Sequence, residues 1–590
     1  MIQGTIAFTL SVFVFTFSII WAVCVKKMRY KRGRIMTPLN IIFGGVALSA
    51  VIMFIPIYNQ MFANAGYSAG KILLLSMHNT IRLFIVDGEF SIIMDNLGIV
   101  HEKVQDLYTM LAAVLFVLAP FLTFGFVMSF FKNISAYKNY YLKYYSDVYV
   151  FSELNEQALA LARSLKSNRK KRIIVFTDIF ETNDEKTYEL MDQAYELGAI
   201  MFKKDISVVN FGFHSANSNL TFFIIGSDAD ENVKQSLALI HRYQDRKKAE
   251  LYVFTTSVNS ELLLSKSTTG NMKVRRINEV QSLISRHLYD EGFEIFQTAK
   301  EGDKEKKDIS VLIIGMGSIG TEMTKALSWF CQMDGYRLTI NAYDLEKNAE
   351  EKFAYECPEL MDEKFNHNFE TEGEAQYYIH IHSGVDVSTK IFLDMTDQIK
   401  PVTYVFIALG DDEKNIQLAV KLRTWLLKRG ENPRIDAVVK NADKKFALED
   451  VGNYSGQKYD IHFIGDTKSS YSEKVVFESD IEMEALKRHL KWGKEEDFWR
   501  FEYNYRSSIA SAIHRKMKRL CGIPGVDKEP CDRLPDEKVN LRKLEHCRWN
   551  AYMRSEGFTY AEKRNNLAKT HHCLVPFDEL SPEEQAKDDD

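Results

Sequence analysis

Residues 309–320 read ISVLIIGMGSIG, and this stretch decides the fold of the central part of the chain. The apolar, β-branched run before the first glycine is typical of a short strand that is buried on both faces of a sheet. Apolar residues at helical spacing follow over 321–330, and a second strand-like run, 338–343, ends at Asp344. The order strand, glycine turn, helix and strand predicts a parallel β–α–β arrangement.

The three glycines of this turn have the spacing of a phosphate-binding loop. Gly315 allows a tight turn, Gly317 lets the backbone approach a pyrophosphate, and Gly320 lets the helix pack closely on the strand. The free N–H groups of the helix N-terminus attract phosphate, and an acid at the end of the next strand can accept hydrogen bonds from a ribose. The predicted nucleotide-binding residues of this segment are Gly315, Gly317, Ser318, Ile319, Gly320 and Asp344. The alternative is a turn of the same shape that has lost its ligand.

The length of 590 residues predicts about three or four domains. The net charge of -5 and the sequence pI near 6.3 provide no basic surface for nucleic acid, so no nucleic-acid partner is expected. The seven cysteines form no C-x-x-C pair, which fits reduced thiols and argues against a disulfide framework. Four cysteines lie near histidines close to the C-terminal end, but without zinc-finger spacing, so no metal site is predicted.

Three uncharged runs near the N-terminus are long enough to cross a bilayer as helices: Thr5–Val25, Leu39–Ile57 and Leu107–Phe131. They predict a transmembrane region of about three helices over 1–134. Basic residues cluster over 26–34, and the positive-inside rule places this loop in the cytoplasm and the N-terminus outside. The expected protein is therefore a multi-pass membrane protein whose large C-terminal region is cytoplasmic.

The segment 58–104, between the second and third runs, is more polar. Its apolar residues are interrupted by Arg82, Asp87 and Glu89, which makes a further crossing unfavourable. The favoured interpretation is an amphipathic helix in the membrane interface or a segment packed against the helix bundle, and the alternative is a fourth crossing or a re-entrant loop.

Two segments, 146–300 and 308–466, follow the same plan of apolar strands alternating with helices. An apolar strand precedes GSDADENV at 226–233 in the first segment and GDDEKNI at 410–416 in the second. This repetition predicts an internal duplication in which each copy forms a parallel sheet.

The two copies differ where a ligand would bind. In the second copy, Gly410 and Asp411 of the repeated turn join the candidate nucleotide site. In the first copy, Ser152-Glu153-Leu154-Asn155 replaces the glycine turn, so a pyrophosphate cannot approach the backbone closely. We interpret the first copy as structural or as a site for another ligand.

These segments resemble the tandem NAD-binding domains (TrkA-N or RCK domains) of potassium-channel and potassium-uptake regulators, over about 148–466. The glycines and Asp344 carry the resemblance in the second copy, and only the topology carries it in the first. The resemblance implies two Rossmann-like domains, NAD(H) or another adenine nucleotide as the ligand, and a homo-oligomer, a dimer or a tetramer. It also implies that the domains act on a membrane pore.

The C-terminal part contains a second resemblance. The segment 467–536 is charged and helical with interleaved aromatic residues, and is predicted to be a packed connector rather than a nucleic-acid stacking surface. Residues 541–553 read LRKLEHCRWNAYM and predict an amphipathic helix, and KTHHCLVPFDEL follows at 569–580. The two motifs resemble the ryanodine-receptor (RyR) domain, so a small helical RyR-like domain is expected over 537–590.

The second resemblance implies a further adenine-nucleotide site, with aromatic rings for the base and cations for the phosphates. Its predicted residues are Arg548, Trp549, Tyr552, Arg564 and His571. The alternative interpretation is that Trp549 and Tyr552 belong to the core and that the arginines lie on the surface.

The expected fold class is therefore α/β with an α-helical membrane anchor, two tandem Rossmann-like doubly wound parallel sheets and a small RyR-like domain. The expected function is a membrane-bound nucleotide-sensing regulatory protein, either a ligand-gated, potassium-type ion channel or a transport regulator. A nucleotide-activated membrane effector without a selective pore is the alternative. A membrane-bound NAD-dependent oxidoreductase is less favoured, because no substrate domain of familiar length follows the second copy. No catalytic residues are predicted, and the protein is not expected to be an enzyme.

Overall fold

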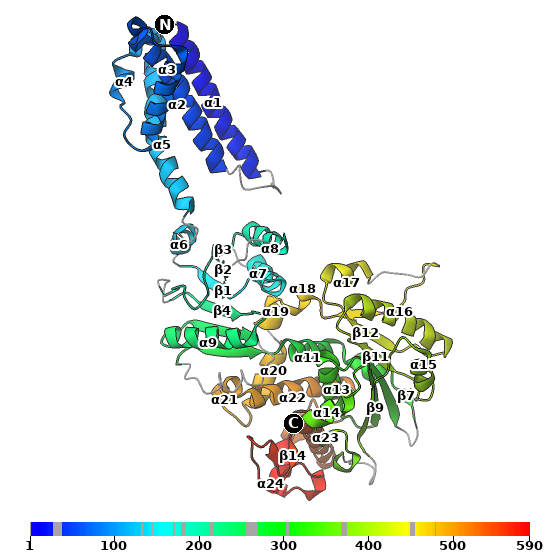
Figure 1. Ribbon diagram of the computed structural model, residues 1–590. Helices are drawn as coiled ribbons and strands as arrows, with labels where there is room; N and C mark the ends of the chain where they lie inside the picture. Colours follow the sequence, from blue (N-terminus) through cyan, green and yellow to red (C-terminus); the bar gives the residue numbers. More distant parts are fainter. Residues whose placement is uncertain are drawn as a thin grey trace. The chain divides into compact units, whose positions relative to one another are not determined.

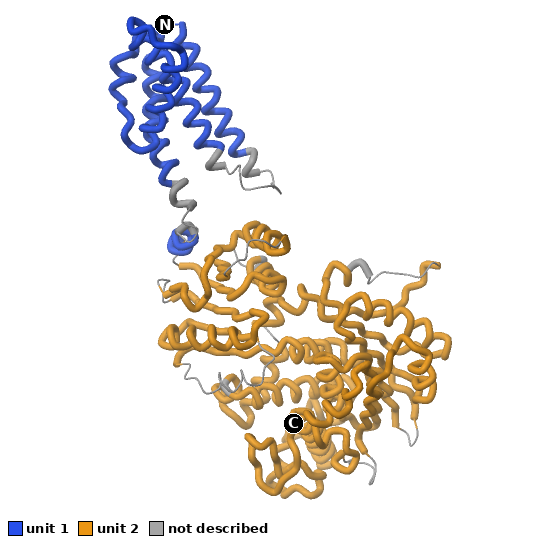
Figure 2. Tube along the Cα trace, viewed as in Figure 1, with its two compact units in different colours: residues 1–142 blue, residues 143–590 orange. Residues whose placement is uncertain are grey.

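The computed structural model forms two compact units, residues 1–142 and 143–590 (Figure 2). The described residues are 2–27, 38–130, 134–143, 145–168, 172–178, 185–212, 217–254, 270–302, 306–366, 375–448, 455–477 and 480–589. Each unit has its own hydrophobic core, and the two units are described separately below.

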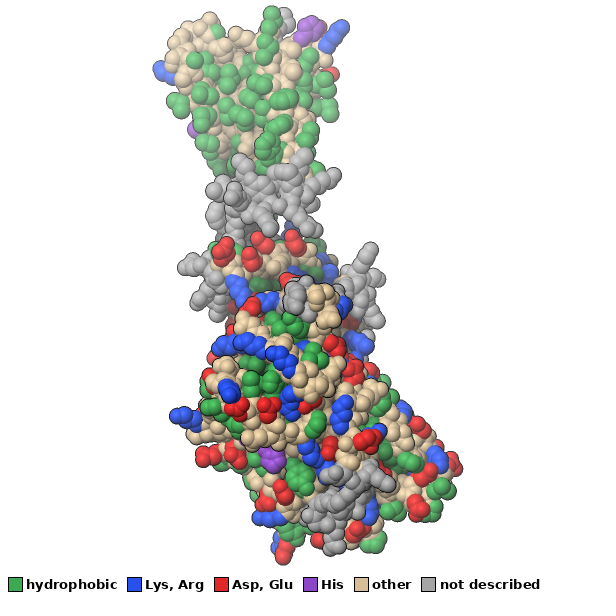
Figure 3. Space-filling model, turned by 90° about the vertical axis from the view of Figure 1, so that its right-hand side faces the viewer, with side chains coloured by type: hydrophobic (Ala, Val, Ile, Leu, Met, Phe, Trp, Pro, Cys, Tyr) green, Lys and Arg blue, Asp and Glu red, His purple; other side chains and the backbone are tan. Residues whose placement is uncertain are grey.

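Unit 1 contains three long apolar helices, α1 (Ile2–Lys27), α2 (Pro38–Met61) and α5 (Glu102–Phe130). Among the described residues, these are the helices that are long and apolar enough to cross a membrane, and they coincide closely with the three apolar runs of the sequence. Hydrophobic side chains cover much of the face of this unit that Figure 3 shows, as expected for a surface in contact with lipid.

The polar segment between the second and third spans forms α3 (Ala69–Phe84), α4 (Ser91–Met94) and the short 3₁₀ turns Ala63–Ala65 and Leu97–Ile99. Helix α3 is amphipathic and packs its buried side chains, including Ile72 and Leu83, into the core of the bundle. Arg82 lies 2.9 Å from both Asp87 and Glu89, so the charged residues at the end of α3 pair with one another. Helix α3 thus packs against the bundle, as the favoured interpretation of this segment expects. After α5, helix α6 (Ile134–Tyr141) completes the unit.

Unit 2 begins with a six-stranded parallel sheet in the order β3-β2-β1-β4-β5-β6 (Figure 1). Its strands are β1 (Asp147–Phe151), β2 (Arg172–Thr177), β3 (Ile200–Phe202), β4 (Leu220–Ile224), β5 (Ala249–Phe254) and β6 (Lys273–Ile277). Its helices are α7 (Glu156–Asn168), α8 (Glu185–Glu196) and α9 (Ala229–Tyr243). The residues of β2 and β4 are fully buried, which explains their near-continuous apolar runs, whereas the charged edge strand β6 is only partly buried.

The second sheet has the parallel order β10-β9-β8-β11-β12-β13, and the short β7 (Lys300–Glu301) pairs antiparallel with β8. The parallel strands are β8 (Lys307–Ile314), β9 (Tyr336–Asp344), β10 (Tyr377–Ser383), β11 (Tyr404–Ile407), β12 (Arg434–Val438) and β13 (His462–Ile464). The helices are α13 (Ser318–Phe330), α14 (Ala349–Glu356), α15 (Lys390–Thr396), α16 (Asp412–Lys428) and α17 (Ala442–Leu448). Val311 and Ile313 of β8 enter one core and Leu312 and Ile314 enter another, so both faces of this sheet are covered. The predicted α/β class with parallel sheets is confirmed.

The equal strand order of the two sheets agrees with the predicted duplication, and a buried asparagine marks it at atomic detail. In the first sheet, Asn232 accepts a hydrogen bond from the Gly226 N–H and donates to the Phe254 carbonyl. In the second, Asn415 accepts from the Leu409 N–H and donates to the Val438 carbonyl. Each asparagine thus ties the turn after the fourth strand to the end of the fifth.

The remaining helices of unit 2 follow one or the other sheet in sequence, and some of them pack on both. They are α11 (Glu279–Glu291), α12 (Phe293–Gln297), α18 (Thr467–Ser470), α19 (Glu473–Val476), α20 (Asp480–His489), α21 (Glu495–Arg500), α22 (Glu502–Leu520), α23 (Pro535–Ser555) and α24 (Pro582–Gln585). Helix α11 follows the first sheet in sequence, but its Ile284 and Leu288 pack in the core of the second sheet. Conversely, α19 returns to the first sheet, where Glu473 pairs with Arg172 at 2.6 Å.

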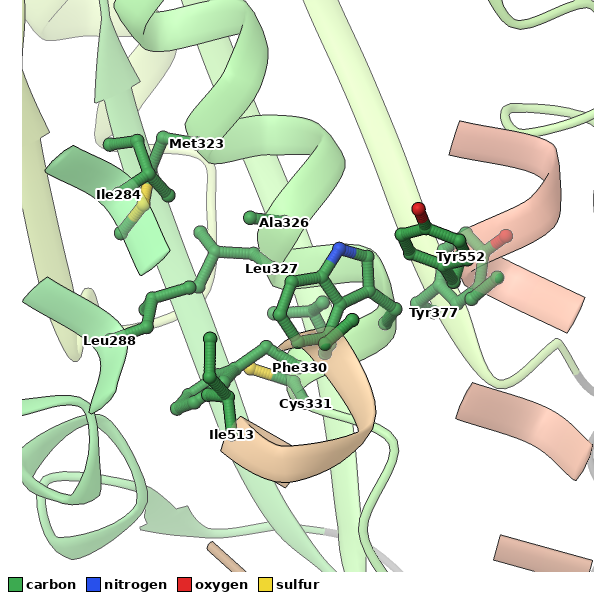
Figure 4. Close-up of a cluster of buried hydrophobic side chains, with 14 of the residues drawn as sticks. Ile284, Leu288, Met323, Ala326, Leu327, Phe330, Cys331, Tyr377, Ile513 and Tyr552 are labelled. Atoms are coloured by element: carbon green, nitrogen blue, oxygen red, sulfur yellow. The ribbon is translucent and has the colours of Figure 1, made fainter. Parts of the chain in front are cut away.

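The C-terminal segment packs on the second sheet through α23, which lies against α13. Trp329 of α13 and Tyr552 of α23 contact at 6.4 Å between ring centroids, and Ile513 of α22 belongs to the same core (Figure 4). A two-stranded parallel sheet, β14 (Thr559–Tyr560) with β15 (Thr570–His571), and 3₁₀ turns complete the chain. The core of the second sheet is therefore continuous with that of the C-terminal helices.

Candidate functional site

Two of the three glycines in the turn between β8 and α13 stand where the fold leaves no room for a side chain. Gly315 has a φ of +92°, in the region that favours glycine, and a Cβ there would lie 2.5 Å from the Ala408 carbonyl oxygen. At Gly320, a Cβ would lie 1.8 Å from the Gly315 carbonyl oxygen. Gly317 differs from both, because a Cβ there would meet nothing within 4 Å and its φ of -66° is an ordinary value. Two glycines are thus required by the fold, and the third borders open space.

We expect Gly320→Ala to lower the free energy of unfolding by about 2 to 3 kcal/mol, because the new methyl group overlaps a backbone carbonyl that cannot turn away. Urea unfolding of wild type and variant measures the difference. Gly317→Ala is the matched control and should unfold at nearly the same urea concentration as wild type. Equal stability of Gly320→Ala would show that the start of α13 is loosely packed.

The acid at the end of β9 is bound to this turn. Asp344 accepts hydrogen bonds from the Met316 N–H, at 2.5 Å, and from the Glu346 N–H, at 2.7 Å. A carboxylate has about four lone-pair positions, so these two bonds leave Asp344 able to accept from further hydroxyl groups. Gly317 has no side chain that could cap α13, and in the part of the chain that the structure describes the N–H groups of Ser318 and Ile319 have no side-chain acceptor.

Gly410 and Asp411 lie in the turn that follows β11, the strand that pairs with β8. Gly410 has a φ of +82°, and Asp411 caps α16 by accepting a hydrogen bond from the Lys414 N–H at 2.9 Å. In the sheet, β9 lies on one side of β8 and β11 lies on the other, so the strand order reverses at β8. Ligand crevices of open α/β sheets form at such reversals. The eight predicted residues of this site therefore gather at the carboxyl ends of β8, β9 and β11.

The equivalent turn of the first sheet is filled by a side chain. A Cβ at Gly226 would lie 2.5 Å from Oε1 of Glu153, so the Glu153 carboxylate occupies the space between the turns after β1 and β4. Burial, together with the nearby Asp178, raises the pKa of Glu153 above its usual value. Asp178 also accepts a hydrogen bond from the Leu154 N–H at 3.3 Å, as Asp344 does from Met316. The interpretation of the first copy as structural is favoured by this arrangement.

A cavity of about 600 Å³ opens beside the start of α13. Its walls include Ser318, Ile319 and Glu322 of α13, together with residues of α11, α22 and α23. Tyr552, one of the residues predicted for a second ligand, lies on this wall. The sequence patterns did not indicate this cavity, because its residues come from many elements that are distant in sequence, including strands of both sheets.

Glu322 is the carboxylate of the cavity with the most unusual environment. The pKa of Glu322 is raised to about 7, first by burial and then by the neighbouring Glu556, while Lys325 and Arg506 oppose this shift. An acid whose pKa is raised on folding costs no stability below its unfolded-state pKa, and the cost grows until the pH passes the folded-state pKa.

We therefore expect the stability of the wild type to fall between pH 4.5 and pH 7, where the unfolded but not the folded chain ionises Glu322. Glu322→Gln should be more stable than wild type by about 2 kcal/mol at pH 8 and nearly equal to it at pH 4.5. Urea unfolding at the two pH values measures this. A difference that is the same at both pH values would contradict the assignment.

The residues predicted for a second nucleotide site fall into separate groups. Arg548 and Tyr552 are buried, and Arg548 donates to Glu545 at 2.7 Å. Trp549 and His571 contact each other edge to face at 4.9 Å. Arg564 is exposed, and its nearest hydrogen-bond acceptor is the Asn566 side chain at 3.0 Å. The structure thus brings Trp549 and His571 together, brings Arg548 and Tyr552 together at another face of α23, and leaves Arg564 apart.

The ligand atoms of His571, His572 and Cys573 lie within 4.8 Å of one another. However, Nδ1 of His571 accepts a hydrogen bond from the Cys573 N–H at 3.1 Å. A neutral imidazole that accepts at Nδ1 carries its proton on Nε2, so this ring offers no lone pair to a metal in the arrangement observed.

Comparison of the chain with protein-family models gives no match, and comparison with curated proteins also gives none.

Proposed function

We propose that this protein is a membrane-bound sensor of NAD(H) or another adenine nucleotide, and that unit 2 binds the nucleotide at the β8–α13 turn. The observation that carries the proposal is the open space at Gly317, between an uncapped helix N-terminus and an acid hydrogen-bonded to the same turn. The strand order of the second sheet, which is the order of dinucleotide-binding folds, supports it.

In the proposed complex, the phosphates lie on the N–H groups of Ser318 and Ile319, where the helix dipole favours negative charge. One ribose lies against Asp344, at the end of β9. The other end of the ligand extends toward Gly410 and Asp411, beyond β11. The phosphates would need a residue without a side chain at position 317, and glycine meets this requirement.

Regulation would follow from the packing of α13. This helix begins at the proposed phosphate site and ends in the core shared with α22 and α23, where Leu327 and Phe330 are fully buried. A nucleotide that binds one arrangement of these helices more tightly than another shifts the population toward it. We propose that this shift, in a homo-oligomer, controls ion flow through unit 1 or through a transport protein beside it.

Mass spectrometry of small molecules released from the detergent-purified full chain tests the nucleotide proposal. We expect an adenine nucleotide from wild type, and none from Gly317→Asp, whose carboxylate would occupy the phosphate position. Ser581→Asp is the control, since it adds the same charge at an exposed helix N-cap of the C-terminal segment, a position where Asp is also a favourable capping residue. A wild type that neither retains a nucleotide nor binds NAD(H), ADP or ATP in titrations would overturn the proposal.

Recordings in planar bilayers test the membrane part separately. Nucleotide-dependent unitary currents with a preference for potassium would support a channel. Nucleotide-dependent release of dyes of several sizes from liposomes, without ion preference, would instead indicate a membrane-disrupting effector. Steady oxidation of NADH with candidate substrates would contradict a purely regulatory role.

A further inference from the structure

The cavity beside α13 contains a carboxylate that the nucleotide proposal does not use. Glu322 lies on its wall, and the side chain of Gln281 from α11 lies close enough to lower its pKa. Within the described part of the chain, no lysine, arginine or histidine lies within salt-bridge distance of Glu322, whereas the other charged residues around it are paired.

The paired residues leave one negative charge in excess on this wall. The ion pairs are Arg506–Glu502 at 2.6 Å, Arg506–Glu556 at 3.5 Å, Arg276–Glu502 at 3.4 Å and Lys325–Glu356 at 2.7 Å. Glu322, Glu502 and Glu556 therefore share two guanidinium groups, and the lysine of α13 is held by a carboxylate of α14. A carboxylate in a partly buried wall is unfavourable unless a positive charge comes close to it.

Aromatic rings and a hydroxyl group without a partner complete the same wall. Trp329, Tyr505 and Tyr552 line the cavity, and the faces of such rings attract organic cations. Tyr552 is only 4 % exposed, and its hydroxyl has no hydrogen-bond partner in the described part of the chain. Buried hydroxyls are rarely left unpaired, so this one indicates a missing polar group in the cavity.

We propose that the cavity is a binding site for a small organic cation, whose ammonium or guanidinium group pairs with Glu322 and whose polar end reaches the Tyr552 hydroxyl. The cavity adjoins the glycine turn, because Ser318 and Ile319 lie on its wall. Glu322 is not part of the proposed nucleotide site, and the cation proposal goes beyond nucleotide sensing. The two sites share α13, because Glu322 lies one helical turn after Ser318. Occupation of the cavity therefore fixes the helix that would hold the phosphates.

The size and lining of the cavity favour an organic cation over other ligands. A volume of about 600 Å³ far exceeds that of a bare metal ion, and aromatic rings are poor ligands for hard cations. On the α13 wall an anion would face Glu322, and the two arginines of this wall, Arg276 and Arg506, are already paired with carboxylates. A neutral apolar ligand would leave both Glu322 and the Tyr552 hydroxyl without partners.

Agmatine and spermidine serve as probes in thermal unfolding and calorimetric titration of the detergent-purified full chain, with MgCl₂ at matched ionic strength as the comparison. We expect at least one probe to raise the Tm of wild type and to bind at least about 10-fold more weakly to Glu322→Gln. Tyr552→Phe should bind several-fold more weakly, while Glu189→Gln, an exposed acid of α8, should bind as wild type.

Because Glu322→Gln is expected to be more stable than wild type at pH 8, a lost response there cannot be due to unfolding. Gly317→Asp should keep the response to the cation, which separates this site from the nucleotide site. The proposal is overturned if neither probe binds wild type, if Glu322→Gln binds equally well, or if MgCl₂ produces the same shift.

Discussion

We expect Gly317→Asp to bind NAD(H), or the adenine nucleotide that the wild type retains, at least about 1000-fold more weakly, a loss of about 4 kcal/mol. The added carboxylate would stand where the N-terminus of α13 faces the ligand, and would oppose the phosphates by both its volume and its charge. Isothermal titration of the purified full chain measures the affinity.

The same substitution should leave the fold intact, because a Cβ at Gly317 meets no atom within 4 Å and the backbone there is ordinary. An unchanged Tm beside a lost affinity would assign the effect to the ligand. Gly317→Ala should weaken binding less than Gly317→Asp, since it adds volume without charge. Equal affinity of all three proteins would show that the ligand does not lie on this turn.

The parts of this site that follow from local sequence could be predicted. A strand, a glycine turn and an acid after the next strand lie within 309–344, and the register of β8 with β9 brings them together. The asparagine that braces each repeated turn could also have been found, because Asn232 and Asn415 occupy equivalent places in the duplicated motif. Local patterns suffice where the partners are close in sequence.

The parts that depend on distant elements could not be predicted. Helix α11 follows the first sheet but packs on the second, and this exchange creates the cavity between α11, α13, α22 and α23. Nothing in the sequence around Glu322 marks it, because its neighbours Gln281 and Glu556 belong to other helices. Likewise, Glu153 replaces a glycine-turn residue, but only the structure shows that its carboxylate fills the space beside Gly226.

Helical geometry alone could have corrected the prediction that all five residues of the second nucleotide site face one ligand. Positions four apart share one face of a helix, so Arg548 and Tyr552 lie together, and both are buried. Trp549 is rotated about 100° from Arg548 and instead meets His571. A single ligand that contacts both pairs would have to reach two faces of α23.

We expect Asp436→Ala to lower the free energy of unfolding by about 3 to 5 kcal/mol, because it leaves buried charges without their partner. Asp436 of β12 is fully buried and lies 2.9 Å from Arg434 and 3.1 Å from His287, and it accepts a hydrogen bond from the Tyr404 hydroxyl at 2.7 Å. Arg434 also pairs with Glu291 of α11 and with Glu294. The network therefore fastens α11, one wall of the cavity, to the second sheet.

The pH dependence separates this charge network from ordinary packing. Burial alone would raise the pKa of Asp436, but His287 and Arg434 outweigh it and lower the pKa to about 2. The contribution of an acid with a lowered pKa is complete above its unfolded-state value near 3.8 and is lost as the pH falls toward 2. The difference in the free energy of unfolding between wild type and Asp436→Ala should thus be full at pH 7 and shrink below pH 4.

Glu413→Ala, which removes an exposed partner of Lys444, is the control and should change the free energy of unfolding by less than about 1 kcal/mol. A loss of stability from Asp436→Ala no larger than this control would mean that α11 is held by its apolar face alone.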